Sequence, residues 1–244
     1  FYIVLINHKT NQMKKISLLI AVFASFYCVA QIPSFTVQYF DAKPWQQTEI
    51  AQIFDNYYEG VEFKSGGLYL ERLRAGNTEG THRIVFFGDR ENFGRKEGEK
   101  TSEEVRAFYR EFSDNIENWG NSYTGRILDY SGEGSPDDYG YIQIYEIKVA
   151  DQVAFLKAHK KIVSKMSKVM EGRPVAFGTY DIGAPNGASH WVAVAYKNRA
   201  DNIKIKAASE KYTKEWGEYF STRGEVEDTG NFDLTILKTY GSFN

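Results

Sequence analysis

Cysteine is nearly absent from this chain, because its 244 residues include a single one, Cys28. A chain with one thiol forms no internal disulfide, so its fold depends on a packed core. An excess of basic charge is also lacking, since 30 Lys and Arg residues face 32 Asp and Glu residues and the net charge is −2. Nucleic-acid-binding proteins usually present a basic face. We therefore expect no nucleic-acid partner.

Long hydrophobic runs are missing except near the N-terminus. Residues 16–30 form an apolar run of about 15 residues behind two lysines, whereas a membrane-spanning helix needs roughly 20. The run ends in Cys28-Val29-Ala30, the small-x-small pattern of a signal-peptidase site. We interpret residues 1–12 as an upstream extension and residues 13–30 as a signal peptide. An uncleaved anchor and a lipidated Cys28 are the alternatives.

This interpretation predicts an exported protein, periplasmic or extracellular in a bacterium, with no stable membrane insertion after cleavage. Removal of the signal peptide also removes Cys28, so the mature chain has no cysteine nucleophile.

The chain repeats its own pattern at a near-constant offset. Residues 81–87 and 189–195 both begin with a small hydroxyl residue and a histidine, and these histidines, His82 and His190, are 108 positions apart. Offsets of 109 and 105 positions relate Ile127 to Ile236 and Gln38 to Gln143. Such agreement indicates a duplicated unit, which often encloses a cavity between its copies.

Each half has the pattern strand, helix, strand, strand, helix, strand. In the first half we expect strands at 35–41, 68–73, 81–87 and 123–130 and helices at 45–58 and 101–119. In the second half we expect strands at 141–148, 174–180, 189–196 and 232–239 and helices at 151–170 and 203–220. The predicted domains are a first repeat (31–130), a Gly-, Ser- and Asp-rich linker (131–140) and a second repeat (141–244).

The βαββαβ order is that of a ferredoxin-like unit, an α+β fold with a four-stranded antiparallel sheet and both helices on one face. Two such units hide their bare faces against each other. The doubled chain resembles the dimeric α/β-barrel superfamily, which includes antibiotic-biosynthesis monooxygenase-like, EthD-like and chlorite dismutase-like proteins. The resemblance implies a fused pseudo-dimeric α/β barrel with the helices outside, a monomer acting as a pseudo-dimer. No motif selects one family.

Alternation along the third strand of each repeat separates two faces. One face carries His82 and His190 with aliphatic residues, and the other carries Arg83 and Trp191. The more uniformly apolar histidine face is expected to pack on the helices. Arg83 and Trp191 then line the cavity, where Arg83 meets a carboxylate or oxyanion of a ligand. The reverse assignment, with His82 and His190 inside, differs by a one-residue register shift.

The first strands suggest further cavity residues. We expect Gln38, Gln143 and Tyr145 to face the cavity, with Val37 and Ile144 among the residues that face the helices. A structural hydrogen bond across the sheets is the alternative role for the glutamines. Tyr180, beside the turn before His190, joins the candidate ligand-binding residues.

Function is less well defined than fold. The aromatic content of 16% and the lack of a catalytic motif favour a protein that binds a small, partly apolar or aromatic molecule between the repeats. The alternative is a cofactor-independent monooxygenase- or isomerase-type enzyme with His190 as acid/base, with Trp191, Arg83 and Tyr180 orienting the substrate. No metal site is predicted, because His82 and His190 alone do not make one. No cofactor is expected; a haem group is a third hypothesis, which the resemblance to chlorite dismutase-like proteins suggests.

Overall fold

A computed structural model describes residues 33–76 and 79–241. The expected upstream extension and signal peptide lie outside the described residues. The first repeat contains β1 (Pro33–Ala42), α2 (Gln47–Tyr58), β2 (Gly67–Gly76), β3 (His82–Asp89), α3 (Ser102–Asp114) and β4 (Ile116–Ser131). The second contains β5 (Tyr141–Val149), α4 (Gln152–Lys165), α5 (Ser167–Met170), β6 (Val175–Ile182), the 3-10 turn η1 (Pro185–Gly187), β7 (His190–Tyr196), α6 (Arg199–Ser209), α7 (Thr213–Thr222) and β8 (Val226–Gly241).

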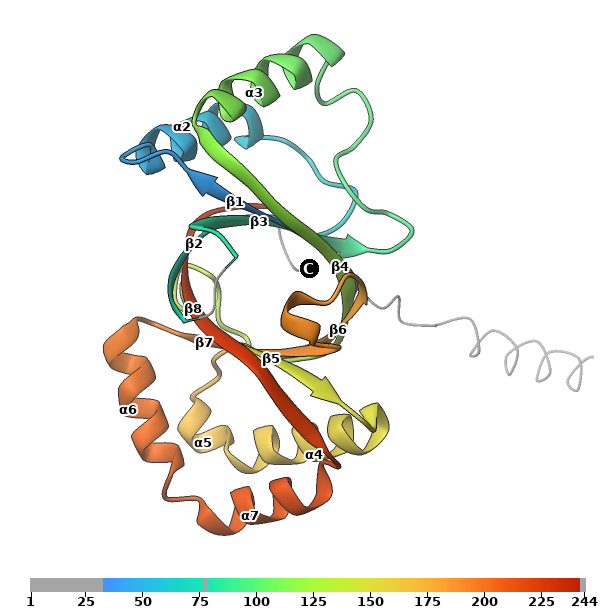
Figure 1. Ribbon diagram of the computed structural model, residues 1–244, viewed down its shortest axis with the longest axis vertical. Helices are drawn as coiled ribbons and strands as arrows, with labels where there is room; N and C mark the ends of the chain where they lie inside the picture. The colour runs from blue at the N-terminus through green and yellow to red at the C-terminus, as the bar shows by residue number, and fades with distance from the viewer. Residues whose placement is uncertain (1–32, 77–78, 242–244) are drawn as a thin grey trace, which may run out of the picture. The chain divides into compact units, whose positions relative to one another are not determined.

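The eight strands close into one antiparallel barrel in the order β1-β3-β2-β8-β5-β7-β6-β4 (Figure 1). Each repeat contributes a ferredoxin-like sheet, β4-β1-β3-β2 or β8-β5-β7-β6. The β2–β8 and β4–β6 ladders join the two sheets edge to edge. The predicted α+β pseudo-dimeric barrel is therefore confirmed.

The helices cover the outside of the barrel in two groups. Helices α2 and α3 lie on one side, and α4 to α7 lie on the opposite side (Figure 1). Apolar side chains at helical spacing explain this docking: Phe54 of α2 and Phe112 of α3 are fully buried against Phe40 and Leu70 of the sheet. A capping box between Thr101 and Glu104 fixes the start of α3.

Some elements differ from the sequence expectation. The helix expected at 101–119 ends at Asp114, and β4 begins two residues later. Strands β4 and β8 are each 16 residues long, because each pairs along its length with strands of both repeats. Residues 117–122, near the start of β4, are exposed and lack the alternation of apolar and polar residues that predicts a strand. The helices expected at 151–170 and 203–220 are each divided into two.

The barrel separates two kinds of core. One lies between the sheet and the helices of each repeat, and the other fills part of the barrel interior. The interior core includes Phe35, Tyr39, Phe87, Ile144 and Phe232. Within the described residues, no helix combines the length and apolar character that a membrane crossing requires.

Candidate functional site

A cavity of about 710 Å³ occupies the barrel interior. Its wall is mostly apolar and aromatic, with Phe35, Tyr69, Ile127, Trp191 and Ala193 among the lining side chains. Several inner-face residues, including Tyr69, Ile127 and Ala193, remain only partly buried although they lie at mid-strand. The side chains therefore do not fill the barrel, and the space is of the size that ligand sites usually have.

The third strands have the expected orientation. Arg83 and Trp191 line the cavity, as do Ala193 and Ala195, while His82 and His190 lie on the outer face. Tyr180 also lines the cavity. Whether these residues bind a ligand stays a prediction.

The expected orientation of the first strands is wrong. Val37 and Ile144 line the cavity, whereas Gln38, Gln143 and Tyr145 do not. The Gln38 amide donates to the backbone oxygen of Gly120 at 2.8 Å, and Gln143 accepts from Asn202 of α6 at 3.2 Å. Tyr145 packs in the outer clusters, under the helices.

His190 does not reach the cavity. Its ring stacks on Phe177 of the outer face, its Nδ1 lies 2.7 Å from Ser189 Oγ, and its Nε2 lies 3.1 Å from Gln152 Oε1. His82 is placed alike, with Nδ1 at 2.9 Å from Thr81 Oγ1 and its ring stacked on Phe40. A role for His190 as acid/base inside the barrel is therefore a wrong prediction, because the strand pleat directs both rings outward.

A buried ion pair stands at one end of the cavity. Arg83 donates through Nε to Glu71 Oε2 at 2.5 Å and through Nη1 to the Tyr39 hydroxyl at 3.1 Å. The Arg83 guanidinium also lies 5.3 Å from the ring centre of Phe232, within cation–π range. Arg83 and Glu71 face each other across the β2–β3 ladder. The charge of Arg83, which we expected a ligand to meet, is thus balanced by the protein.

A second carboxyl lies beside this pair. Glu146 of β5 is 1% exposed and accepts a hydrogen bond from Asn186 Nδ2 of η1 at 2.8 Å. Burial raises the pKa of Glu146, while Asn186, Arg83 and a hydrogen bond from Tyr180 partly oppose that rise. Burial also raises the pKa of the Tyr180 hydroxyl. This end of the barrel therefore holds groups that accept or donate protons.

The two repeats differ at this end. In the first repeat, β2 and β3 pair Glu71 with Arg83; at the equivalent place in the second repeat, β6 and β7 pair Gly178 with Trp191. A Cβ on Gly178 would lie 2.4 Å from the Trp191 ring, so glycine is needed to seat the indole. At this pair of equivalent positions the first repeat thus supplies an ion pair, and the second supplies a flat aromatic wall.

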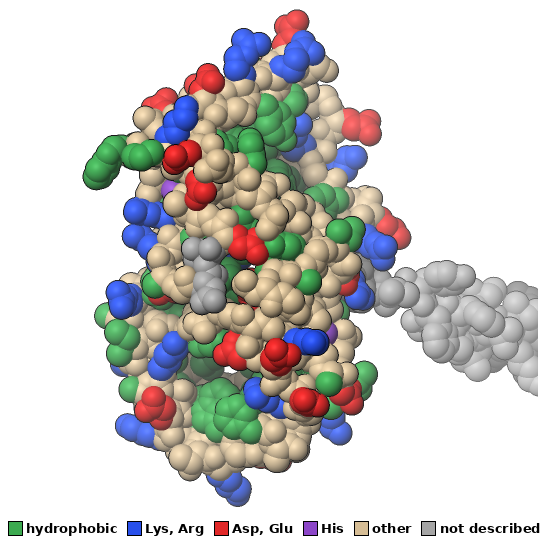
Figure 2. Space-filling model, viewed as in Figure 1, with side chains coloured by type: hydrophobic (Ala, Val, Ile, Leu, Met, Phe, Trp, Pro, Cys, Tyr) green, Lys and Arg blue, Asp and Glu red, His purple; other side chains and the backbone are tan. Residues whose placement is uncertain are grey.

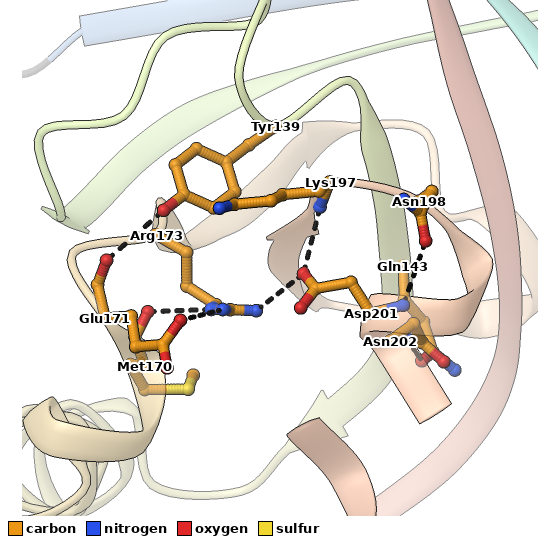
Figure 3. Close-up of polar contacts among 9 residues, drawn as sticks. All are labelled: Tyr139, Gln143, Met170, Glu171, Arg173, Lys197, Asn198, Asp201 and Asn202. Carbon is orange, nitrogen blue, oxygen red and sulfur yellow. Dashed lines mark hydrogen bonds and ion pairs between the residues drawn. The ribbon is translucent and has the colours of Figure 1, made fainter. Parts of the chain in front are cut away.

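The other end of the cavity reaches the surface at the linker. Exposed linker residues, including Gly132, Glu133 and Asp137, line it there. Arg173, 1% exposed, lies behind the linker and stacks on Tyr139, with its guanidinium carbon 5.6 Å from the ring centre (Figure 3). Tyr139 also donates to the backbone oxygen of Glu171 at 3.2 Å. These contacts hold the linker at the cavity entrance.

Arg173 in turn is held by the second repeat. Its Nε donates to the Met170 backbone oxygen at 2.7 Å, and its Nη1 donates to Asp201 of α6 at 3.0 Å (Figure 3). Arg173 therefore connects the linker with the ends of α5 and α6.

The cavity wall offers no axial ligand for haem of the histidine type. The histidines of the described residues all lie outside the barrel interior: His82 and His190 are on the outer face of the sheet, and His159 of α4 packs against Phe177 on that face. Within the same residues, no cluster of three or more His, Cys, Asp or Glu side chains is arranged to hold a metal ion. The residues present do not fit the haem hypothesis.

His159 provides a prediction for pH dependence. It is 3% exposed between Phe155 and Phe177, and burial lowers its pKa from 6.5 to about 4. The folded state thus binds fewer protons than the unfolded state between these values, so stability falls as the pH drops from 6.5 towards 4. We expect His159→Phe to remove about 2 to 3 kcal/mol of this loss, measured by urea unfolding at pH 4.5 and 7. Equal pH dependence of the unfolding free energy in the unmodified protein and in His159→Phe would contradict this role of His159.

Charged side chains are mixed on the visible surface. Figure 2 shows acidic and basic groups interspersed over this face, without a field of one sign. This agrees with the near-neutral composition and offers no basic stripe for a nucleic acid on that face.

No family model and no curated protein sequence matches this chain. Solved structures do. A "putative monooxygenase" from Fusobacterium nucleatum subsp. nucleatum is 18% identical, with a TM-score of 0.60 over 88% of this chain and 96% of that one. A second "putative monooxygenase", from Lactobacillus acidophilus, is 13% identical, with a TM-score of 0.57 over 86% and 96%. This chain has the dimeric α/β-barrel fold. The predicted superfamily resemblance is confirmed for the fold, and no specific family is selected.

The sequence prediction missed Tyr39, Glu71 and Glu146 as site residues. A signal for the two carboxyls was present in the alternation of their strands. Glu71 shares a strand face with Tyr69 and Leu73. Glu146 shares one with Ile142 and Ile144. A charged residue at such a position is costly unless it is paired or functional.

Proposed function

We propose that this protein is exported and binds a small, flat, largely apolar or aromatic molecule inside its barrel. The cavity of about 710 Å³ with its aromatic wall is the observation that supports the proposal. The entrance is the linker end, and the chain acts as a monomeric pseudo-dimer. Export rests on the N-terminal sequence pattern.

A cavity-filling variant tests binding. Ala193 lines the cavity beside Trp191, so Ala193→Phe adds a ring to that space. We expect the affinity for the neutral fluorophore N-phenyl-1-naphthylamine to fall at least roughly tenfold, because the added ring displaces ligand contacts. Fluorescence titration measures it.

Ala200→Phe is the matched control, since Ala200 is exposed on α6. It is expected to bind like the unmodified protein. Equal affinity in the Ala193 variant and its parent would contradict binding in the barrel. Native mass spectrometry of the purified protein tests for a co-purifying molecule.

A cofactor-independent oxygenase or isomerase is the second candidate. The observation that favours it is the pair of Glu146 and Tyr180, where a buried carboxyl with a raised pKa lies beside a hydroxyl of the cavity wall. General acid–base catalysis works best with a group whose pKa lies near the working pH. We propose Glu146, in place of His190, as the acid/base of such a reaction.

Turnover of the co-purifying molecule separates these assignments. With oxygen consumption and chromatographic separation of product from substrate as readouts, Glu146→Gln is expected to lower kcat by roughly a hundredfold or more, while His190→Gln retains it. The reverse result would restore His190 to the site.

A further inference from the structure

Two carboxyls and one guanidinium are buried at the end of the cavity opposite the linker. Glu71 lines the cavity, whereas Glu146 is buried beside it and is not a lining residue; the two are 2% and 1% exposed, and both act electrostatically on Tyr39 together with Arg83. Among the described residues of the wall, Arg83 is the only Lys or Arg side chain. Glu133 and Asp137 add two more carboxyls at the entrance. A ligand therefore meets acidic groups on its way in and one guanidinium at the end.

That guanidinium is already engaged. Its Nε donates to Glu71 and its Nη1 to Tyr39. A ligand carboxylate would have to share Arg83 with Glu71, two side chains of residues that are 8% and 2% exposed. Like charges brought together in such an environment repel strongly, because little solvent screens them.

An uncharged oxygen meets no such repulsion. Arg83 lines the cavity, and its guanidinium carries five N–H donors, of which the bonds to Glu71 and Tyr39 use two. A carbonyl or hydroxyl oxygen on an aromatic ring accepts a hydrogen bond from this guanidinium without adding charge. The flat wall of Trp191, held edge-on to Phe35 at 5.4 Å between ring centres, suits the ring itself.

We propose that the cavity selects uncharged aromatic molecules that carry a carbonyl or hydroxyl oxygen, and that Glu71 and Glu146 exclude their carboxylate analogues. This selection rests on the proposed binding function and adds the charge class of the ligand to it.

Three probes with the same ring system test the selection: 2-acetylnaphthalene, 2-naphthoate and naphthalene. Dissociation constants are measured by calorimetry on the full-length protein at pH 7.5. We expect 2-acetylnaphthalene to bind at least roughly tenfold more tightly than 2-naphthoate, and more tightly than naphthalene, which lacks the oxygen.

Two variants assign the effect to the carboxyls. Glu71→Gln leaves the Arg83 charge unbalanced, so 2-naphthoate is expected to gain roughly tenfold in affinity while 2-acetylnaphthalene changes little. Glu146→Gln, which leaves the ion pair intact, is expected to shift 2-naphthoate in the same direction by a smaller factor. The Glu146 variant therefore tests the selection even if the Glu71 variant does not fold.

The outcomes separate the two proposals. If 2-naphthoate binds the unmodified protein as tightly as 2-acetylnaphthalene, or if neither variant improves its binding, the selection is wrong and binding stands. If naphthalene equals 2-acetylnaphthalene, recognition of the oxygen is wrong. If none of the three binds, the proposed function falls and the selection falls with it.

Discussion

Replacement of Arg83 by leucine is expected to destabilise the protein by about 3 to 5 kcal/mol. The substitution leaves the Glu71 carboxyl buried, 2% exposed, without its cation. The Tyr39 hydroxyl also loses the hydrogen bond that it accepts from Arg83. The free energy of unfolding in urea at pH 7.5 measures the loss.

The double variant Arg83→Leu with Glu71→Leu is the control for this interpretation. It removes both charges at once, so most of the stability is expected to return, because a well-packed apolar pair replaces a buried ion pair at little cost. An equal loss in the single and double variants would show that packing of the Arg83 side chain, and not the stranded charge, determines stability.

Replacement of Arg173 by leucine is expected to cost about 3 kcal/mol. Its guanidinium is fully buried and hydrogen-bonded to Met170 and Asp201 (Figure 3). The substitution also removes the stacking partner of Tyr139 and so loosens the linker. We therefore expect faster cleavage by chymotrypsin after Tyr139 as well as a lower urea midpoint.

Arg199→Leu is the matched control, because Arg199 is exposed at the start of α6. Its effect is expected to stay within about 0.5 kcal/mol. If Arg173→Leu lowered stability and left the cleavage rate at Tyr139 unchanged, the role of Arg173 in holding the linker would be wrong.

The fold could be predicted from the sequence because the same pattern of strands and helices occurs in both halves of the chain. The spacing between His82 and His190 and the βαββαβ order of each half predicted the paired repeats, and the order of strands within each sheet follows from that topology. The lengths of β4 and β8 were not predictable in the same way. Their first residues, 116–122 and 226–231, pair with β1 and β5 of the same repeat, and these mostly exposed, polar segments lack the alternation of a strand.

The faces of the first strands were mispredicted for a physical reason. Alternation identifies two faces but not which one is inside, and polarity was used to decide between them. In this barrel both layers are dry, because Phe40 under the helices is 0% exposed and Tyr39 in the interior is 1% exposed, and the interior also accommodates the Tyr39 hydroxyl on Arg83. Gln38 satisfies its amide on neighbouring backbone and needs no cavity.

Covalent fusion of the two repeats has a chemical consequence. Two identical subunits related by a twofold axis place every interior side chain in the shared cavity twice. A substitution at one position therefore also changes the symmetry-related position. Here the equivalent strand pairs carry Glu71 with Arg83 on one side and Gly178 with Trp191 on the other. A single polypeptide can thus make the two sides of its cavity chemically different, and so bind an unsymmetrical molecule in one orientation.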